Sequence, residues 1–168
     1  EGDNYHALQV LNYTHKGQID VIYIDPPYNT GNKDFKYNDS FIDKEDGYRH
    51  SKWLNFMSKR LKLAHNLLKD DGIMFISIDD NEVENLKKTC NEVFGEINFI
   101  ATIVRNTNSS KNQSLFVSVS HEYCLVYAKN IEILKEIGFQ QIESEILSKE
   151  KTKEGKELIR QFLIHAIK

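Results

Sequence analysis

The sequence has 168 residues, of which 40% are hydrophobic, with a formal net charge of −3 and a pI near 6.1. This length and hydrophobic fraction suit the core of one ordinary domain, and the charge lacks the basic excess that usually marks a nucleic-acid-binding domain. No run of about 18 apolar residues and no charged-then-apolar leader occurs, so the sequence favours neither a transmembrane helix nor a signal peptide.

The chain begins with a predicted helix followed by a predicted strand. Residues 5–13 carry apolar side chains at helical spacing, Asp3 stands where a helix N-cap is expected, and Gly17 is a typical stop. Residues 21–24 are four consecutive apolar residues rich in β-branched side chains, which is typical of a strand buried on both faces of a parallel sheet.

The predicted strand ends abruptly at a motif that places polar groups at its carboxyl end. Pro26 and Pro27 lack the N–H groups that would continue a ladder, so the strand must end after Asp25. Tyr28 follows directly. Open α/β sheets bind ligands at this edge, although Asp25 and Tyr28 taken alone are better explained by an ordinary turn.

The complete string DPPYNTG at residues 25–31, directly after an apolar strand, resembles the catalytic motif of the DNA amino-methyltransferases that act on adenine N6 or cytosine N4. It is most similar to adenine-specific enzymes whose catalytic motif precedes the cofactor motif, including the modification subunits of type III restriction systems. The string SIDDNE at residues 77–82 and the string SHEYCLVYAKN at residues 120–130 support the same resemblance. Cytosine-N4 enzymes usually have Ser in place of the leading Asp, so adenine is favoured.

The resemblance implies roles that fit the chemistry of the reaction. The exocyclic amine of adenine is a poor nucleophile. Asp25 and the Pro26 carbonyl can accept hydrogen bonds from its two N–H groups and so orient it. Pro27 fixes the loop, Tyr28 is the ring on which a flipped-out base stacks, and Asn29 and Thr30 are further candidate substrate contacts. No metal is required for this chemistry.

The resemblance also implies S-adenosylmethionine as the methyl donor, with Asp25 and Asp3 as candidate contacts. Asp3 belongs to a Gly-Asp-Asn string that lies near the cofactor in the resembled family, but it is equally well explained as a helix N-cap. The family's Gly-rich cofactor turn is missing, because none of the eight glycines forms a Gly-x-Gly. Double-stranded DNA, a restriction subunit, a homo-oligomer and a cytoplasmic location are further expectations.

The middle of the chain predicts a loop, a helix, a strand and a second helix. The expected ranges are a polar and aromatic loop at 32–49, a helix at 51–70, a buried strand at 73–78 and a helix at 81–94. Asp79 and Asp80 at the strand end suggest a metal or acid–base site. The stronger interpretation is a capping box between Asp79 and Glu82.

The later chain predicts β-structure and then a charged helical segment. Strands are expected at 97–104, 115–120 and 123–128, with a polar loop at 105–114 whose Arg105 and Lys111 suit phosphate contacts. Cys90 and Cys124 have no metal-ligand spacing, so we expect reduced structural thiols. His121-Glu122 is not a zinc-protease motif, because the second His is absent.

These observations predict an α/β, Rossmann-like methyltransferase fold with a mostly parallel sheet and an antiparallel edge hairpin. We expect residues 1–130 to be the catalytic half of such a domain, and residues 131–168 to be a charged helical segment that could begin a target-recognition region. The opening Glu1 and the missing Gly-x-Gly suggest part of a longer chain. The alternatives are a catalytically inactive DNA-binding or assembly fragment, and cytosine-N4 methylation.

Overall fold

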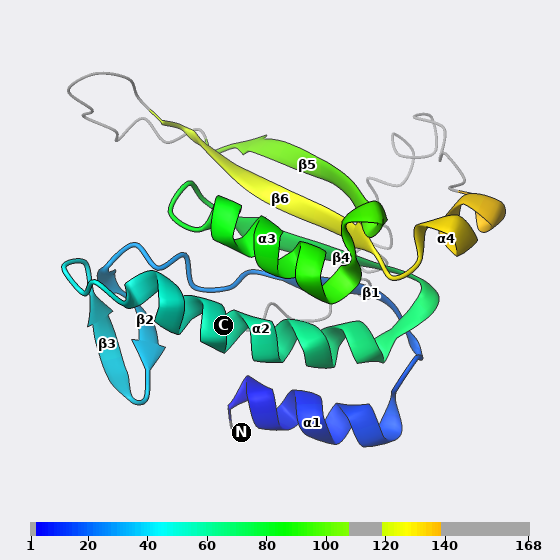
Figure 1. The fold of residues 1–168 in the computed structure, drawn as a ribbon, viewed down its shortest axis with the longest axis horizontal. Helices are drawn as coiled ribbons and strands as arrows, with labels where there is room; N and C mark the ends of the chain where they lie inside the picture. The colour runs from blue at the N-terminus through cyan, green and yellow to red at the C-terminus, as the bar shows by residue number, and fades with distance from the viewer. Residues whose placement is uncertain (1–2, 108–118, 139–168) are drawn as a thin grey trace, which may run out of the picture.

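A computed structural model describes residues 3–107 and 119–138 of the chain (Figure 1). The elements, in order, are α1 (Asn4–Thr14), β1 (Ile19–Ile24), β2 (Asn32–Tyr37), β3 (Ser40–Asp43), α2 (Arg49–Leu67), β4 (Leu68–Ile78), α3 (Val83–Phe94), a 3-10 turn (Glu96–Asn98), β5 (Phe99–Asn106), β6 (His121–Ala128) and α4 (Ile131–Ile137). Apart from the β2–β3 pair, helices and strands alternate from α1 to α3, as the sequence predicts for an α/β domain.

The main sheet has a parallel part and an antiparallel part. Its strand order is β1-β4-β6-β5; β1 pairs with β4 in parallel, and β6 pairs antiparallel with both β4 and β5. The parallel register sets Ile24 opposite Ile76, so the ends of β1 and β4 lie side by side. The α/β class and the antiparallel edge pair are confirmed.

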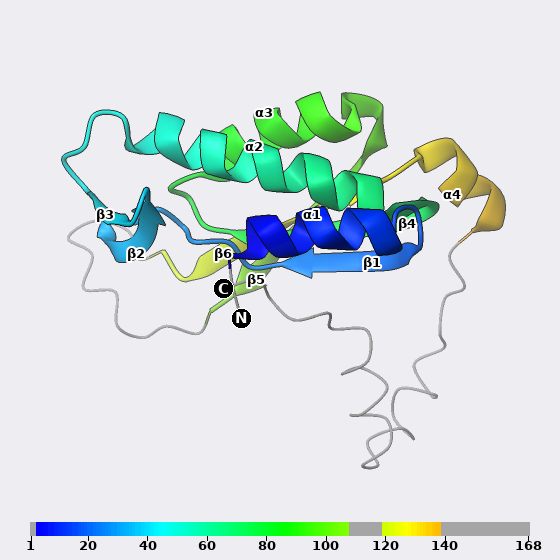
Figure 2. The same ribbon diagram turned by 90° about the horizontal axis from the view of Figure 1, so that it is seen from below.

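The helices α1, α2 and α3 lie on one face of the main sheet (Figure 2). Between them and the sheet is the larger hydrophobic cluster, in which Trp53 and Leu61 of α2, Leu86 of α3 and Ile76 of β4 are fully buried. A smaller cluster contains Ile73 of β4, Val126 and Ala128 of β6, and Leu134 of α4. Because successive strand residues point to opposite faces, Ile73 and Ile76 can serve different clusters.

The strand β1 is less enclosed than its apolar sequence predicts. Ile22 and Ile24 are buried against the helices, but Val21 and Tyr23 on the opposite face are only half-buried. The expectation of burial on both faces is therefore wrong within the described residues, in which β1 ends the strand order.

The second helix ends three residues before its predicted end. Leu68 already pairs with Ile19 as the first residue of β4. The backbone N–H groups of Gly17 and Gln18 donate to the carbonyls of Asn66 and Leu67 at 3.0 Å each. These carbonyls at the end of α2 are thus satisfied by the approach to β1, which a pattern of helical spacing cannot reveal.

The predicted loop at 32–49 is wrong over residues 32–43, which form the β2–β3 hairpin. Asn38 and Asp39 connect the strands with φ values of +50° and +63°, and Tyr37 pairs directly with Ser40. A two-residue connection with both residues at positive φ is the favoured hairpin geometry, and Asn and Asp tolerate it best. The buried Phe35 of β2 attaches the hairpin to α2 through an edge contact with Phe56, with ring centroids 5.2 Å apart.

The predicted capping box at the start of α3 is also wrong. The Asp79 carboxylate accepts from the backbone N–H of Asn81 at 2.9 Å, but the Glu82 side chain is buried and points away from the Asp79 backbone toward other partners. The helix itself is confirmed, beginning at Val83 rather than Asn81.

Several other expectations can be compared directly with the described residues. The predicted helix at 5–13 and the strands at 97–104 and 123–128 correspond to α1, β5 and β6. Cys90 and Cys124 are both free, as predicted. Three expectations fall largely outside the described residues: the loop 105–114 with Lys111, the strand 115–120 and the helical segment beyond residue 138. The division of the chain at residue 130 stays a prediction.

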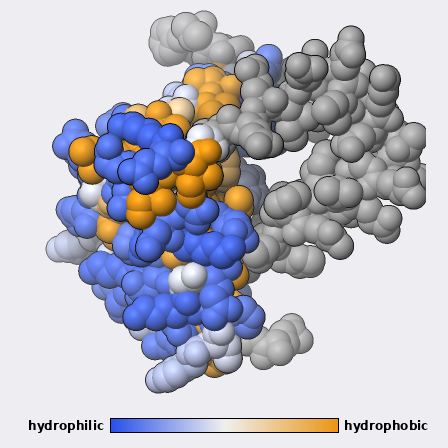
Figure 3. All heavy atoms as spheres, turned by 90° about the vertical axis from the view of Figure 1, so that its right-hand side faces the viewer, coloured by the Kyte–Doolittle hydropathy of each residue, from blue (hydrophilic) through white to orange (hydrophobic). Residues whose placement is uncertain are grey.

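The surface shows mixed polarity. The face toward the right-hand side of Figure 1 is mostly hydrophilic, with hydrophobic side chains gathered in its upper part (Figure 3). On α4, Ile137 is exposed while Leu134 is buried. Within residues 3–107 and 119–138, no helix is both long and apolar enough to cross a membrane.

Candidate active site

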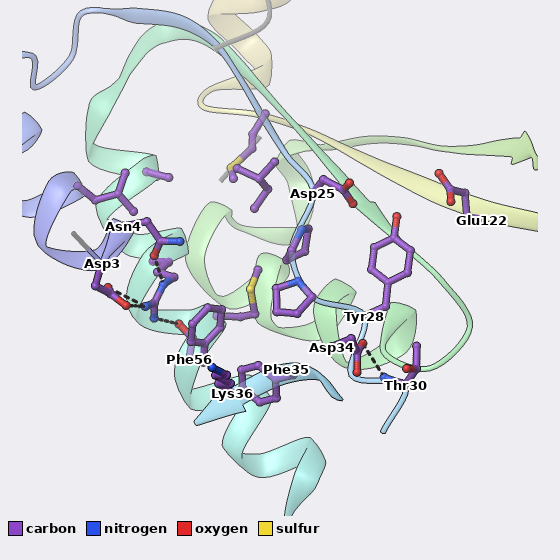
Figure 4. A pocket seen from close by; sticks show the side chains of 18 of the residues that line it. Asp3, Asn4, Asp25, Tyr28, Thr30, Asp34, Phe35, Lys36, Phe56 and Glu122 are labelled. Carbon is purple, nitrogen blue, oxygen red and sulfur yellow. Dashed lines mark hydrogen bonds and ion pairs between the residues drawn. The ribbon is translucent and has the colours of Figure 1, made fainter. Parts of the chain in front are cut away.

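A cavity of about 910 Å³ opens at the carboxyl end of β1. It is bounded by the loop after β1, the start of α1, one side of α2, the β2–β3 hairpin, and the adjoining parts of β5 and β6 (Figure 4). Its apolar wall includes Leu8, Ile24, Met57, Ala64 and Met74. The volume lies within the range of about 300–1,000 Å³ typical of ligand pockets.

The motif Asp25-Pro26-Pro27-Tyr28 lies on the wall of this cavity, as the sequence predicts. Asp25 is half-buried and follows β1 directly, and Pro26 is buried. The Pro27 carbonyl accepts a hydrogen bond from the Trp53 indole Nε1–H at 2.7 Å. Since the Pro27 carbonyl is occupied by α2, the Pro26 carbonyl is the better candidate acceptor for a substrate amine.

Tyr28 projects with its hydroxyl toward Asp25 and Glu122 (Figure 4). Burial, followed by the charge of the Asp25 carboxylate and a hydrogen bond to it, raises the pKa of Tyr28 well above its ordinary value. The phenol is therefore neutral at physiological pH, and its ring presents an uncharged aromatic surface to the cavity.

The two residues after Tyr28 are placed differently from each other. Asn29 is fully buried, with φ +59°, and is not part of the cavity wall; its side-chain N–H₂ donates to Glu82 Oε1 at 2.6 Å and to the Arg49 carbonyl at 3.3 Å. Thr30 does line the cavity, and its backbone N–H donates to Asp34 Oδ2 at 2.9 Å. Contact of either residue with substrate stays a prediction.

The far end of the cavity is formed by the start of α1. The Asp3 carboxylate accepts from the backbone N–H of Tyr5 at 2.7 Å, so the predicted N-cap is confirmed. The same carboxylate pairs with Arg60 of α2 at 3.0 Å, and Asn4 Oδ1 accepts from Arg60 Nε at 2.6 Å. The Arg60 guanidinium also lies 3.6 Å from the ring centroid of Phe56, which fixes its orientation.

The residues present fit the cofactor that the resemblance implies. The cavity has an apolar wall and, at the start of α1, the oxygen atoms of Asp3 and Asn4, whose remaining lone pairs can accept hydrogen bonds, a combination suited to a ligand with a hydroxylated and an apolar part. Asp25 lies apart from Asp3 and Asn4, near Tyr28 (Figure 4). Among residues 3–107 and 119–138, no group of three or more His, Cys, Asp or Glu side chains is arranged to hold a metal ion.

Sequence reasoning gave no role in the site to Glu122, and none to the link from Trp53 to the loop. Glu122 of β6 is 9% exposed, lines the cavity and forms an ion pair with Arg105 of β5. The sequence pattern around His121-Glu122 suggested only a metal motif, which the sequence excludes. The position of Glu122 at the cavity follows from the antiparallel register, which sets Arg105 opposite Glu122. Trp53 is fully buried in the core, and its indole N–H also donates to the Pro27 carbonyl.

Comparison with known proteins gives consistent results. The model of the DNA methylase family, N6_N4_Mtase, matches residues 19–164. The chain is 39% identical to the EcoPI Mod subunit of a type III restriction-modification enzyme from Escherichia phage P1, over 87% of this chain and 26% of the relative. It is 38% identical to the EcoP15I Mod subunit of Escherichia coli, over 80% of this chain and 24% of the relative. It is 44% identical to the type II methyltransferase M.KpnI of Klebsiella pneumoniae, over 77% and 31%.

Solved structures show the same fold at low sequence identity. A DNA modification methylase of Thermus thermophilus, TTHA0409, matches with a TM-score of 0.56 and 16% identity, over 96% of this chain and 62% of that one. The PvuII cytosine-N4-specific methyltransferase matches with a TM-score of 0.54 and 14% identity, over 84% and 55%. The chain spans about a quarter of the length of the Mod subunits it matches. Since the family model covers most of its length, this chain belongs to the DNA methylase family.

Proposed function

We propose that this protein transfers a methyl group from S-adenosylmethionine to N6 of a flipped-out adenine in DNA, as part of a restriction-modification system. Support comes from the relatives, two of which are Mod subunits of type III restriction-modification enzymes. The single observation that carries the proposal is Asp25, which lies on the cavity wall beside Pro26 and the neutral Tyr28.

The site accounts for catalysis by orientation. Asp25 Oδ and the Pro26 carbonyl accept hydrogen bonds from the two N–H groups of the adenine amine, which fixes the direction of the amine's lone pair. Correct orientation of a reacting group is worth several kcal/mol in favourable cases. Two consecutive prolines and the bond from Trp53 to Pro27 hold these acceptors in place.

Tyr28 supplies the surface on which the base rests. A base inside a duplex cannot reach a cavity of this kind, so it must leave the stack, and an aromatic ring recovers part of the lost stacking energy. A neutral phenol beside two carboxylates, Asp25 and Glu122, keeps the wall apolar where the base lies.

The cofactor occupies the remainder of the cavity in this proposal. Asp3 and Asn4 bind its polar end, Asp25 lies near the reacting end, and Leu8 and Met57 pack against its apolar parts. When bound, S-adenosylmethionine supplies an electrophilic methyl group. The missing Gly-x-Gly would have to be provided by residues beyond this chain, in line with its short coverage of the Mod subunits.

Double-stranded DNA, a restriction subunit and a second copy of the chain are the proposed partners, and the cytoplasm is the proposed location. Residues 1–130 are proposed as the catalytic half and residues 131–168 as the start of a target-recognition region. Cytosine-N4 methylation is the second candidate, because the PvuII enzyme of the same fold is cytosine-N4-specific. The leading Asp25 favours adenine.

The test is transfer of labelled methyl groups to mixed-sequence DNA, followed by nucleoside analysis. The chain and the natural protein that contains it are assayed beside Asp25→Ala. N6-methyladenine that disappears in Asp25→Ala supports the proposal, and N4-methylcytosine would replace it by the second candidate. No methylated nucleoside from the natural protein would refute both.

A further inference from the structure

We propose that Glu82 is a positioning residue, which holds the catalytic loop in its active geometry through the side chain of Asn29. This inference rests on the proposed methyl transfer, because it assigns Glu82 a role in that same site. Glu82 lies outside the cavity wall, at the residue that precedes α3.

The Glu82 carboxylate joins three parts of the chain. Its side chain is fully buried and accepts from Asn29 Nδ2 at 2.6 Å, from His50 Nδ1 at 2.6 Å and from Asn85 Nδ2 at 2.8 Å. Asn29 belongs to the loop after β1, His50 to the first turn of α2, and Asn85 to the first turn of α3. One carboxylate therefore fixes the catalytic loop to the starts of two helices.

Asn29 transmits this constraint to the reacting groups. It follows Tyr28 directly and has φ +59°, a conformation that Asn tolerates better than most residues. Its two side-chain N–H bonds are both engaged, by Glu82 and by the Arg49 carbonyl. With Trp53 bonded to the Pro27 carbonyl on the other side, Tyr28 is anchored through both neighbouring residues.

A buried carboxylate contributes little net stability to a protein core. Burying a charge carries a desolvation penalty, and an apolar side chain of similar volume often stabilises a protein equally well. What the carboxylate adds is directional: three donors must meet two oxygen atoms, which defines the position of each donor. This geometry points to positioning of the loop and not to stability alone.

Two variants break the link at its two ends while sparing the cavity wall. Glu82→Gln keeps the volume but turns one acceptor into a donor that faces other donors, and Asn29→Gly removes the side chain while preserving access to positive φ. We expect each to lower kcat about 100-fold, since small misplacements of reacting groups have effects of that order. KM for the cofactor should change less than about 3-fold, and the double variant should be no worse than the poorer single one.

The matched control is Tyr127→Phe. It removes a buried hydroxyl that donates to Asn91 Oδ1 at 2.6 Å, a hydrogen bond to the same helix α3 but far along it from Glu82. Its kcat per folded molecule should stay within about 2-fold of the parent, because no catalytic group depends on it. Equal effects in Tyr127→Phe and Glu82→Gln, or additive losses in the double variant, would overturn the positioning role.

A second readout does not depend on activity. Backbone amide hydrogen exchange at Tyr28, Asn29 and Thr30 should become faster in Glu82→Gln than in Tyr127→Phe when both are fully folded. Unchanged exchange at these amides would refute the inference even if activity fell. If the parent protein transfers no methyl group, the proposed function fails, whereas faster exchange confined to the loop still supports the anchoring by Glu82.

Discussion

Replacing Trp53 by Phe separates the two functions of this side chain. Trp53 is fully buried, and its indole Nε1–H donates to the Pro27 carbonyl at 2.7 Å. The Pro27 carbonyl is part-buried, and leaving it without a protein donor costs about 1–3 kcal/mol. The smaller ring leaves a void of roughly 40 Å³, which adds about 1 kcal/mol at roughly 24 cal/mol per Å³. We therefore expect Trp53→Phe to lower the free energy of unfolding by about 2–4 kcal/mol.

Urea denaturation measures this loss, and methyl transfer per folded molecule measures its effect on the loop. The matched control is Leu61→Ala, which truncates another fully buried side chain of α2, away from the loop, at a cost of about 2–5 kcal/mol. Only Trp53→Phe should also slow methyl transfer at saturating substrates. Equal transfer rates in the two variants would refute the claim that the bond to Pro27 holds the catalytic loop.

Three further predictions concern the cavity wall and its polar end. Tyr28→Ala should lower kcat/KM about 5- to 150-fold, since base stacking is worth about 1–3 kcal/mol. In the same initial-rate assay, Tyr28→Phe should stay within about 3-fold of the parent protein. Equal losses of kcat/KM in the two variants would exclude stacking. Burial and the Asp25 carboxylate raise the pKa of Tyr28 above its ordinary 10.0, so the folded state holds this proton more tightly than the unfolded state. The stability that results is complete below pH 10 and is lost as the pH rises further. Urea denaturation between about pH 9 and pH 11 should show a shallower loss of stability in Tyr28→Phe, and identical slopes would contradict this linkage. Asp3→Asn should lower the free energy of unfolding by less than about 1 kcal/mol, because Asn caps helices as well as Asp and the ion pair between the exposed Asp3 carboxylate and Arg60 is worth about 0–1 kcal/mol. It should weaken cofactor binding in calorimetry, and unchanged affinity would leave Asp3 as a helix cap alone.

The local pattern of the sequence was sufficient for elements whose signals are contiguous. The apolar run before Asp25 and the two prolines predict both β1 and its end, and the helical spacing after Asp3 predicts α1. The β2–β3 hairpin also had a local signal, the Asn38-Asp39 pair, which is typical of a two-residue turn. That signal was missed because the flanking residues lack clean alternation.

Non-local contacts explain the remaining differences. The end of α2 is set by hydrogen bonds from residues 17 and 18, which lie far away in sequence. Glu82 follows Asp79 at the spacing of a capping box, yet its partners include Asn29 and His50, which are 53 and 32 residues away. A buried acceptor can choose distant donors over a local cap once tertiary packing brings them near, and no spacing rule contains that information.

The most direct test of the central claim is single-turnover methyl transfer by Asp25→Ala and Asp25→Asn at saturating cofactor and DNA. Because Asn still presents a carbonyl oxygen to the amine, Asp25→Asn should retain measurable N6-methyladenine formation, whereas Asp25→Ala should form none while still binding DNA. Transfer by Asp25→Ala at the rate of the parent protein would contradict the account, because the amine would then be oriented without Asp25.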